Sequence, residues 1–294
     1  MARQKITEFL KTGKILISDG AWGTFFHAKG LKPGECPELW CIDRSFDVLD
    51  VAKSYIDAGA DMIQTNSFGA NIFKLDYYGL AKKVSEINEA AAKISRQAAG
   101  IEKWVIASIG PTGKLLVTEE VIEDELYEAF KTQAIALEKG GADAACIETM
   151  SDIEEACQAV KAVKENTKLE VICTFTFEKT IKGEYRTMMG TDPVNAMNVV
   201  IKAGADIAGT NCGNGIERMI EIVRLMRSAD KEIPILVHAN AGLPKNENGI
   251  TIFPDTPQDM ASLVPDLIAA GANIVGGCCG TTPAHVSAMR EVVG

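Results

Sequence analysis

The chain alternates short runs of apolar residues with longer amphipathic segments. Eight runs are mainly apolar, often β-branched, and lack regular polar alternation: residues 15–17, 62–65, 104–107, 144–147, 171–175, 207–210, 235–237 and 274–277. Strands buried on both faces of a parallel sheet have this character, because helices cover both sides of such a sheet. The pattern therefore predicts eight parallel strands that alternate with helices.

A four-residue repeat marks the ends of several predicted helices. The sequence Ala-Gly-Ala-Asp begins at residues 58 and 203, and variants of it begin at residues 140 and 270, so that the central glycines lie 82, 63 and 67 residues apart. Each repeat follows an amphipathic segment and precedes one of the apolar runs. Glycine just beyond a helix adopts the left-handed conformation that ends the helix. Each interval therefore accommodates two strand–helix units.

Capping residues indicate where other helices begin. A capping box is expected at residues 151–154, and Asp192, Thr256 and Thr282 each precede a proline, as residues at helix N-termini often do. Eight strand–helix units in a chain of this length predict a single α/β domain, a (β/α)8 TIM barrel over residues 1–294. The alternative is an open doubly wound sheet, which usually carries a glycine-rich phosphate loop, and no G-x-G-x-x-G occurs. The polar stretch 244–249 is expected to be a loop after the seventh strand.

Composition and charge narrow the classes of protein. Of 294 residues, 47% are hydrophobic and 24% charged, and the net charge is −10. An acidic chain of this kind is not expected to bind nucleic acid or an anionic membrane. Residues 1–14 lack the apolar core of a signal peptide, and no run approaches the length of a membrane span. Eight scattered cysteines do not resemble a disulfide scaffold, so a reduced, cytoplasmic location is expected.

Three cysteines follow predicted strands at one edge of the expected barrel. Cys212 follows the sixth strand, and Cys278 and Cys279 follow the eighth, where flanking glycines allow adjacent thiols to turn toward one point. Three thiolates with an open fourth position are typical of catalytic zinc, which soft sulfur ligands favour. The alternatives are inert cysteines of the core, as expected for Cys146, Cys157 and Cys173, or a vicinal disulfide, whose geometry is unfavourable.

Acidic and amide side chains also follow the predicted strands. Asp19 and Glu148 are candidates to hold a substrate ammonium group or to accept a proton, although each could instead accept bonds from loop amides. Asn66, Asn211 and Asn240 could orient a substrate or brace the loops. Aromatic side chains that could wall a pocket are Trp22, Phe25 and Phe68. Position at the active-site end of a barrel favours the functional interpretation of the two acids.

Several of these segments carry a resemblance to a known family. Residues 17–24, 65–70, 211–212 and 276–283 resemble the homocysteine S-methyltransferase family, and most closely the homocysteine-binding barrel of cobalamin-dependent methionine synthase. The resemblance implies zinc held by Cys212, Cys278 and Cys279, with the homocysteine sulfur as fourth ligand. It places Asp19 and Glu148 near the substrate's amino group and sulfur. It also implies that backbone amides of the turn at Gly20 and Ala21 receive the carboxylate, with Asn66, Thr149, Asn211 and Asn240 as further substrate-binding residues.

The implied reaction is methyl transfer to homocysteine, which forms methionine. A free thiol is mostly protonated at pH 7, and zinc converts it to the nucleophilic thiolate. No folate or cobalamin module follows the barrel in this sequence, so the expected donor is methylcobalamin on a separate corrinoid protein. S-methylmethionine or another small donor, a non-catalytic zinc or thiol sensor, and a fragment of a longer enzyme remain alternatives. A metal-dependent lyase would need oxygen or histidine ligands instead.

Overall fold

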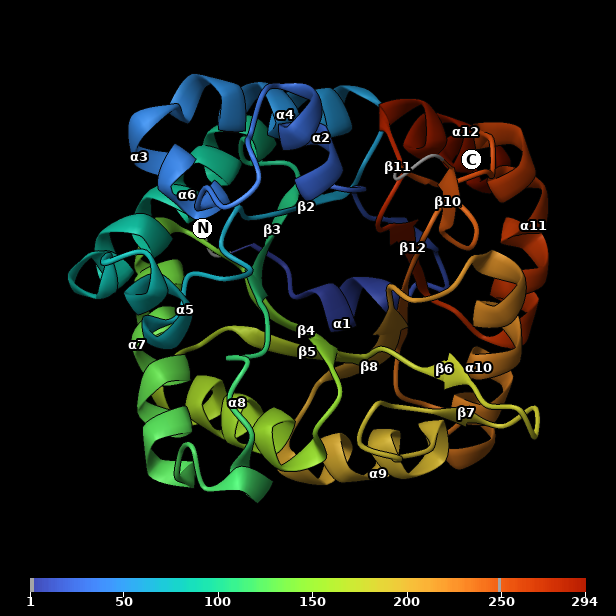
Figure 1. Ribbon diagram of the computed structural model, residues 1–294. Helices are drawn as coiled ribbons and strands as arrows, with labels where there is room; N and C mark the ends of the chain where they lie inside the picture. The colour runs from blue at the N-terminus through green and yellow to red at the C-terminus, as the bar shows by residue number, and fades with distance from the viewer. Residues whose placement is uncertain (1–2, 248–249) are drawn as a thin grey trace.

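The eight apolar runs form the inner sheet of the computed structural model, which describes residues 3–247 and 250–294 (Figure 1). In chain order the barrel strands are β1 (Leu16–Ile17), β2 (Met62–Gln64), β3 (Trp104–Ile109), β4 (Ala144–Met150), β5 (Glu170–Phe175), β8 (Ile207–Asn211), β9 (Ile235–Ala239) and β12 (Ile274–Gly277). They form one sheet in the order β1-β12-β9-β8-β5-β4-β3-β2, with every ladder parallel. All eight predicted strands and the (β/α)8 architecture are confirmed.

Helices form an outer ring around the strands (Figure 1). The longer ones, which pack on the outside of the barrel, are α4 (Ser45–Asp57), α6 (Val84–Ala99), α7 (Glu123–Gly140), α8 (Ile153–Asn166), α9 (Pro193–Ala203), α10 (Ile216–Ala229), α11 (Pro257–Ala270) and α12 (Pro283–Val293). Short helices are α1 (Ile6–Leu10), α2 (Gly23–Ala28), α3 (Trp40–Asp43) and α5 (Ile72–Tyr77), with single 3₁₀ turns at η1 (Pro37–Leu39), η2 (Ala81–Lys83) and η3 (Leu116–Thr118). No helix of the described chain has the length and apolar character needed to span a membrane.

The expected helix starts are confirmed at three of four places. Asp192, Thr256 and Thr282 are the N-cap residues of α9, α11 and α12, and a proline follows each. The expected capping box at 151–154 is wrong in detail. Asp152 caps α8, and its carboxylate accepts hydrogen bonds from the backbone amides of the two residues after Ile153. Aspartate is as good a cap as serine, so the helix begins one residue later.

The lower end of the barrel is closed by the short helix α1. Ile6 and Leu10 pack into a cluster of buried side chains that come from all eight barrel strands. The carboxylate of Glu170, at the start of β5, accepts hydrogen bonds from the backbone amides of Ile6 (2.5 Å) and Thr7 (3.1 Å). A negative charge at a helix N-terminus satisfies amides that would otherwise lack partners. The amino-terminal segment is therefore a plug of this end.

The four-residue repeats end helices as predicted. Their glycines have positive φ, from 100° at Gly59 to 120° at Gly271. The fourth residue of each repeat accepts a hydrogen bond from the backbone amide of the preceding strand, in the pairs Asp61–Ile17, Asp143–Val105, Asp206–Val171 and Asn273–Ile235. A basic side chain also bonds this residue. It comes from the helix that precedes the donating strand around the barrel: α12, α6, α8 or α10. The pairs are Arg290–Asp61, Arg96–Asp143, Lys164–Asp206 and Arg227–Asn273. Each repeat is thus a clamp at the amino-terminal face of the barrel.

The barrel has a seam between β1 and β2, where the described sheet shows no ladder. Individual hydrogen bonds bridge it instead. The amide of Asp61 donates to the carbonyl of Ile17 (2.7 Å), and the carboxylate of Asp19 accepts from the amide of Gln64 (2.9 Å). A buried side chain therefore replaces part of the strand pairing at this point.

Two hairpins were not predicted. Strands β6 (Glu178–Lys179) and β7 (Tyr185–Arg186) pair after β5, and β10 (Lys245–Glu247) pairs with β11 (Ile250–Ile252) after β9. The expectation of a loop over 244–249 is therefore wrong for 245–247, and its last two residues lie outside the described part. The sequence signal for a hairpin was the Asn-Gly dipeptide at 248–249, which commonly joins paired strands.

Candidate active site

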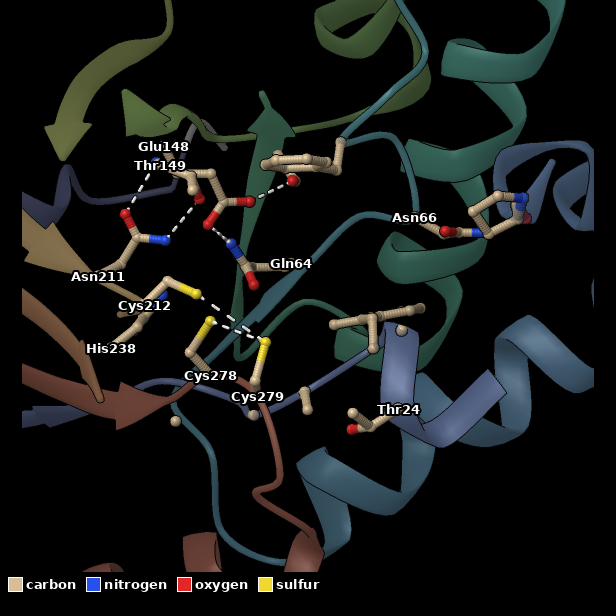
Figure 2. A pocket seen from close by; sticks show the side chains of 18 of the residues that line it. Thr24, Gln64, Asn66, Glu148, Thr149, Asn211, Cys212, His238, Cys278 and Cys279 are labelled. Atoms are coloured by element: carbon tan, nitrogen blue, oxygen red, sulfur yellow. Dashed lines mark hydrogen bonds between the residues drawn. The ribbon is translucent and has the colours of Figure 1, made fainter. Parts of the chain in front are cut away.

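A cavity of about 280 Å³ opens at the carboxyl ends of the barrel strands. Residues from most of these strands line it, which is the usual arrangement of active sites in this fold. Figure 2 shows the thiols of Cys212, Cys278 and Cys279 gathered on one side of the cavity, and Glu148 and Gln64 opposite them. The cavity therefore brings together candidate ligands and acids from strands far apart in the sequence.

The three predicted cysteines converge. Cys212 follows β8, and Cys278 and Cys279 follow β12. The sulfur of Cys279 lies 3.9 Å from that of Cys212 and 4.0 Å from that of Cys278, and all three lie within 4.8 Å of one another. Sulfur atoms bound to tetrahedral zinc at about 2.3 Å lie about 3.8 Å apart. The arrangement therefore fits zinc, and the thiols come from one side, which leaves room for a fourth ligand.

The backbone at the cysteines departs from regular strand geometry. Cys212 has a φ of 58°, in the left-handed region that non-glycine residues seldom occupy, and Gly280 has a φ of 82°. These turns allow thiols that follow two different strands to face a common point. Strained backbone of this kind is concentrated at functional sites.

The electrostatics of the cluster favour a thiolate. Hydrogen bonds from the thiols of Cys278 and Cys279 lower the pKa of Cys212 well below that of a free thiol, and a hydrogen bond from Asn240 contributes in the same direction. The Oδ1 atom of Asn240 is buried and has no hydrogen-bond partner within residues 3–247 and 250–294. The three thiols, one of them favoured as a thiolate, form a donor set suited to a soft cation such as zinc.

Glu148 lies at the end of β4 and lines the cavity. Its carboxylate accepts hydrogen bonds from Gln64 Nε2 (2.8 Å) and from the hydroxyl of Ser108. Burial nevertheless raises the pKa of Glu148 from 4.5 to about 7, because the charged form loses its hydration. The group can therefore change its protonation state near neutral pH, and a cationic ligand would favour its ionised form.

Asp19 is placed behind the cavity wall. Its side chain is fully buried and does not line the cavity. The carboxylate accepts hydrogen bonds from Trp22 Nε1 (2.7 Å), the amide of Gln64 (2.9 Å) and the hydroxyl of Ser18 (3.1 Å). Burial raises the pKa of Asp19 to about 6. In this geometry Asp19 holds two residues that do line the cavity, Trp22 and Gln64.

The other predicted substrate-binding residues differ in where they point. Gly20 and Ala21 line the cavity, but the amide of Ala21 donates to the hydroxyl of Thr281 (3.1 Å), so it is already occupied. Asn66 lies apart from the thiols in Figure 2, and its amide donates to the carbonyl of Pro37 (2.7 Å). Asn240 does not line the cavity.

Thr149 and Asn211 line the cavity and bond each other. Asn211 Oδ1 accepts from the amide of Thr149 (2.8 Å), and Asn211 Nδ2 donates to the hydroxyl of Thr149 (2.8 Å). The amide group of Asn211 is thus largely used within the protein.

Several cavity residues were not identified from the sequence. These are Gln64 and Ser108, which bond Glu148. For Gln64 and Ser108 the available signal was a polar residue inside an otherwise apolar strand. His238, which the sequence places beside Asn240 after the seventh strand as a candidate supporting residue, also lines the cavity, and its buried Nε2 has no partner among the described residues. Among the aromatic residues, Trp22 and Phe68 line the cavity as expected. Phe25 does not, since it packs on Tyr55, and its neighbour Phe26 lines the cavity instead.

Comparisons with known proteins show which family the chain belongs to. Residues 16–293 match the family model described as homocysteine S-methyltransferase. Methionine synthases of Mycobacterium tuberculosis and Mycobacterium leprae are each 30% identical over 95% and 98% of this chain, which spans 25% of their length. The metallated crystal structure of the homocysteine methyltransferase MmuM from Escherichia coli superposes with a TM-score of 0.79, at 22% identity, over 97% of this chain and 98% of that chain. The chain therefore belongs to the homocysteine S-methyltransferase family.

Proposed function

We propose that this protein is a zinc-dependent enzyme that transfers a methyl group to the thiolate of homocysteine and forms methionine. The observation that carries the proposal is the spacing of three sulfur atoms, 3.9 and 4.0 Å apart, at the cavity wall. Zinc bound there would make a coordinating thiol an anion at neutral pH and hold its sulfur in place. Cys212, Cys278 and Cys279 are the proposed ligands. Because these thiols must stay reduced, we place the protein in a reducing compartment, the cytoplasm.

Recognition of the amino acid is assigned to residues on the opposite side of the cavity. Glu148 would hold the substrate ammonium group, because a carboxylate and an ammonium ion form a strong charge-assisted hydrogen bond. Asp19 would act through Trp22 and Gln64, which its carboxylate holds in place. Backbone around Gly20 and Ala21 is the proposed site of the carboxylate. The amide of Ala21 would have to exchange its bond to Thr281 for this role.

The remaining predicted residues are assigned lesser parts. Asn240 is proposed to support the thiol cluster, since it hydrogen-bonds Cys212. Thr149 and Asn211 border the cavity next to Glu148 and Cys212. Asn66 also lines the cavity, but its amide group already donates to the carbonyl of Pro37.

The methyl donor that we propose is methylcobalamin on a separate corrinoid protein. The support is the sequence resemblance to the homocysteine-binding barrel of cobalamin-dependent methionine synthase, together with the similarity to two methionine synthases. A second donor class is favoured by a different observation. Trp22 and Phe68 line the cavity with the buried acid Glu38, and aromatic faces with a carboxylate suit a small sulfonium such as S-methylmethionine.

A donor assay separates these candidates. The zinc-loaded protein is mixed with homocysteine and with methylcobalamin, free or bound to a corrinoid protein, or with S-methylmethionine, and methionine is measured. The corrin spectrum is followed in parallel. Turnover with methylcobalamin supports the first donor, and turnover with S-methylmethionine alone replaces it with the second. Homocysteine binding without methionine from any donor would contradict the proposed catalysis and indicate a zinc or thiol sensor.

A further inference from the structure

Strand β4 is irregular where it reaches the cavity. Its pairing with β5 shifts between Ile147, which faces Cys173, and Met150, which faces Phe175, so that β4 has one additional residue in this interval. Within this bulge Thr149 has a φ of 60°. The left-handed conformation is strongly disfavoured for a β-branched residue. Bulges of this kind redirect side chains next to active sites, and here the bulge includes Glu148 and Thr149, both of which line the cavity.

The side chain of Asn211 clamps this bulge from two strands away. Figure 2 shows its two hydrogen bonds to Thr149, one to the backbone amide and one to the hydroxyl, each 2.8 Å long. The same Oδ1 atom accepts a third bond from the hydroxyl of Thr174 on the intervening strand β5 (2.7 Å). The carbonyl of Asn211 accepts from Thr176 of the same segment (2.8 Å). One residue therefore ties together the upper ends of β4, β5 and β8.

Asn211 also directly precedes Cys212, the other cavity residue with a left-handed backbone, at a φ of 58°. The clamp thus joins two strained positions. One carries a proposed metal ligand, and the other follows the acid proposed to hold the substrate ammonium group. Strain of this kind persists only where surrounding bonds fix it. Without Asn211, the amide and hydroxyl of Thr149 would lose partners in a region that is mostly buried.

We propose that Asn211 is a positioning residue that sets the distance between Glu148 and the thiol cluster, and thereby selects an amino-acid thiol of homocysteine's length. This inference rests on the proposed function. Homocysteine must reach Glu148 with its amino group and the cluster with its sulfur, and cysteine is shorter by one methylene group. A fixed separation therefore favours homocysteine, whereas a relaxed β4 bulge accommodates either ligand. In a well-fitted site, a difference of one methylene group between two ligands changes discrimination between them by about 10- to 200-fold.

The test compares the dissociation constants of homocysteine and cysteine, measured by calorimetry on the zinc-loaded protein. Asn211→Ala is expected to raise the homocysteine Kd by about tenfold and to leave the cysteine Kd within about threefold, so that discrimination falls. Zinc content is expected to stay at one ion per chain, because the three thiols remain. In a Thr149→Gly background the same substitution is expected to change the homocysteine Kd by less than about threefold, since glycine adopts a φ of 60° unaided.

Thr174→Val is the matched control. It removes a hydrogen bond to the same oxygen of Asn211 at a fully buried position, but it leaves both bonds to Thr149. It is expected to lower Tm without changing discrimination. Equal loss of discrimination in this control, or unchanged discrimination in Asn211→Ala, would overturn the inference. If Asn211→Ala does not fold, Thr149→Val, which loses only the hydroxyl partner, is expected to lower discrimination in the same direction, and an unchanged ratio overturns the inference.

A second measurement separates this inference from the proposed function. Failure of the unaltered protein to bind homocysteine would contradict the function. The clamp is then judged by hydrogen exchange of the Thr149 amide, which donates to Asn211. Faster exchange in Asn211→Ala than in Thr174→Val supports the clamp, and equal exchange overturns it.

Discussion

Replacing Glu148 by glutamine is expected to make the protein more stable and a poorer binder of homocysteine. Burial raises the pKa of Glu148 from 4.5 to about 7. A carboxyl group whose pKa is raised on folding stabilises the folded state below its unfolded pKa, and this contribution is lost as the pH rises through the folded value. At pH 8 the ionised group therefore destabilises the fold. Each pKa unit corresponds to about 1.4 kcal/mol, so the cost is about 3 kcal/mol at pH 8 and less than about 1 kcal/mol at pH 5.

Glutamine removes this cost without loss of packing. Its oxygen can accept from Gln64 Nε2, and its amide group can donate to the hydroxyl of Ser108, the two partners of the carboxylate. Glu148→Gln should therefore raise the free energy of unfolding at pH 8, and the gain should be smaller by about 2 to 3 kcal/mol at pH 5. Urea denaturation of the reduced, zinc-free proteins at both pH values measures this difference. The reasoning is refuted if the gain is the same at both pH values.

Homocysteine binding should change in the opposite direction. The neutral amide cannot form a charge-assisted bond with the substrate ammonium group, so the Kd at pH 8 should rise by about tenfold while zinc content stays constant. Glu170→Gln is the matched control, because Glu170 is also buried but accepts three hydrogen bonds from Ile6 and Thr7 at the plug. In Glu170→Gln the new NH₂ group would face N–H and O–H donors that need an acceptor. The free energy of unfolding should therefore fall by about 1 to 2 kcal/mol, with homocysteine binding unchanged.

Three further outcomes are expected. Cys212→Ala should lose zinc by metal analysis while its circular dichroism stays native, because a barrel of this size folds without the metal; full zinc occupancy would contradict the assignment. Homocysteine binding should release about one proton near pH 7, counted by calorimetry in buffers of different ionisation enthalpy, because the thiolate is the bound form; no release would show that the sulfur does not reach the metal. Asp143→Ala should lower the free energy of unfolding, measured in urea, by about 2 kcal/mol, since it removes bonds from Val105 and Arg96. A change below about 0.5 kcal/mol would show that the repeat contacts at the amino-terminal face add little stability.

The fold was predictable because its signals are local and repeated. Strands buried on both faces must be apolar, and glycine after a helix must adopt a positive φ, so both features are visible without any tertiary contact. The two hairpins were missed because their strands are only two or three residues long, and β6 is polar and exposed at both Glu178 and Lys179. Such segments lack the hydrophobic pattern on which the strand prediction depended.

The site was predictable only to the level of position along the chain. A residue that directly follows a barrel strand lies at the active-site end of the barrel. This rule was sufficient to predict that Cys212 lies near Cys278. It does not determine which way a side chain turns. Asn66 turns to Pro37 and Asp19 to the seam, because each finds buried backbone groups there that need a partner. These choices depend on contacts between segments more than 25 residues apart, and the sequence pattern does not encode them.

The clamps at the amino-terminal face have no first or last member, because the final helix bonds the first repeat through Arg290 and Asp61. The molecule is in this respect a ring of four modules, each with two strands and its own internal bond from repeat to strand. Joining the two ends of this sequence and opening the ring between modules, for example at residues 100–103 between α6 and β3, would keep both partners of each internal bond in one continuous stretch of chain. An opening within a module, between β3 and β4, would place Val105 and Asp143 near opposite ends of the new chain, so that their bond would have to form between distant segments. Circular permutation should therefore be tolerated at module borders and poorly tolerated elsewhere.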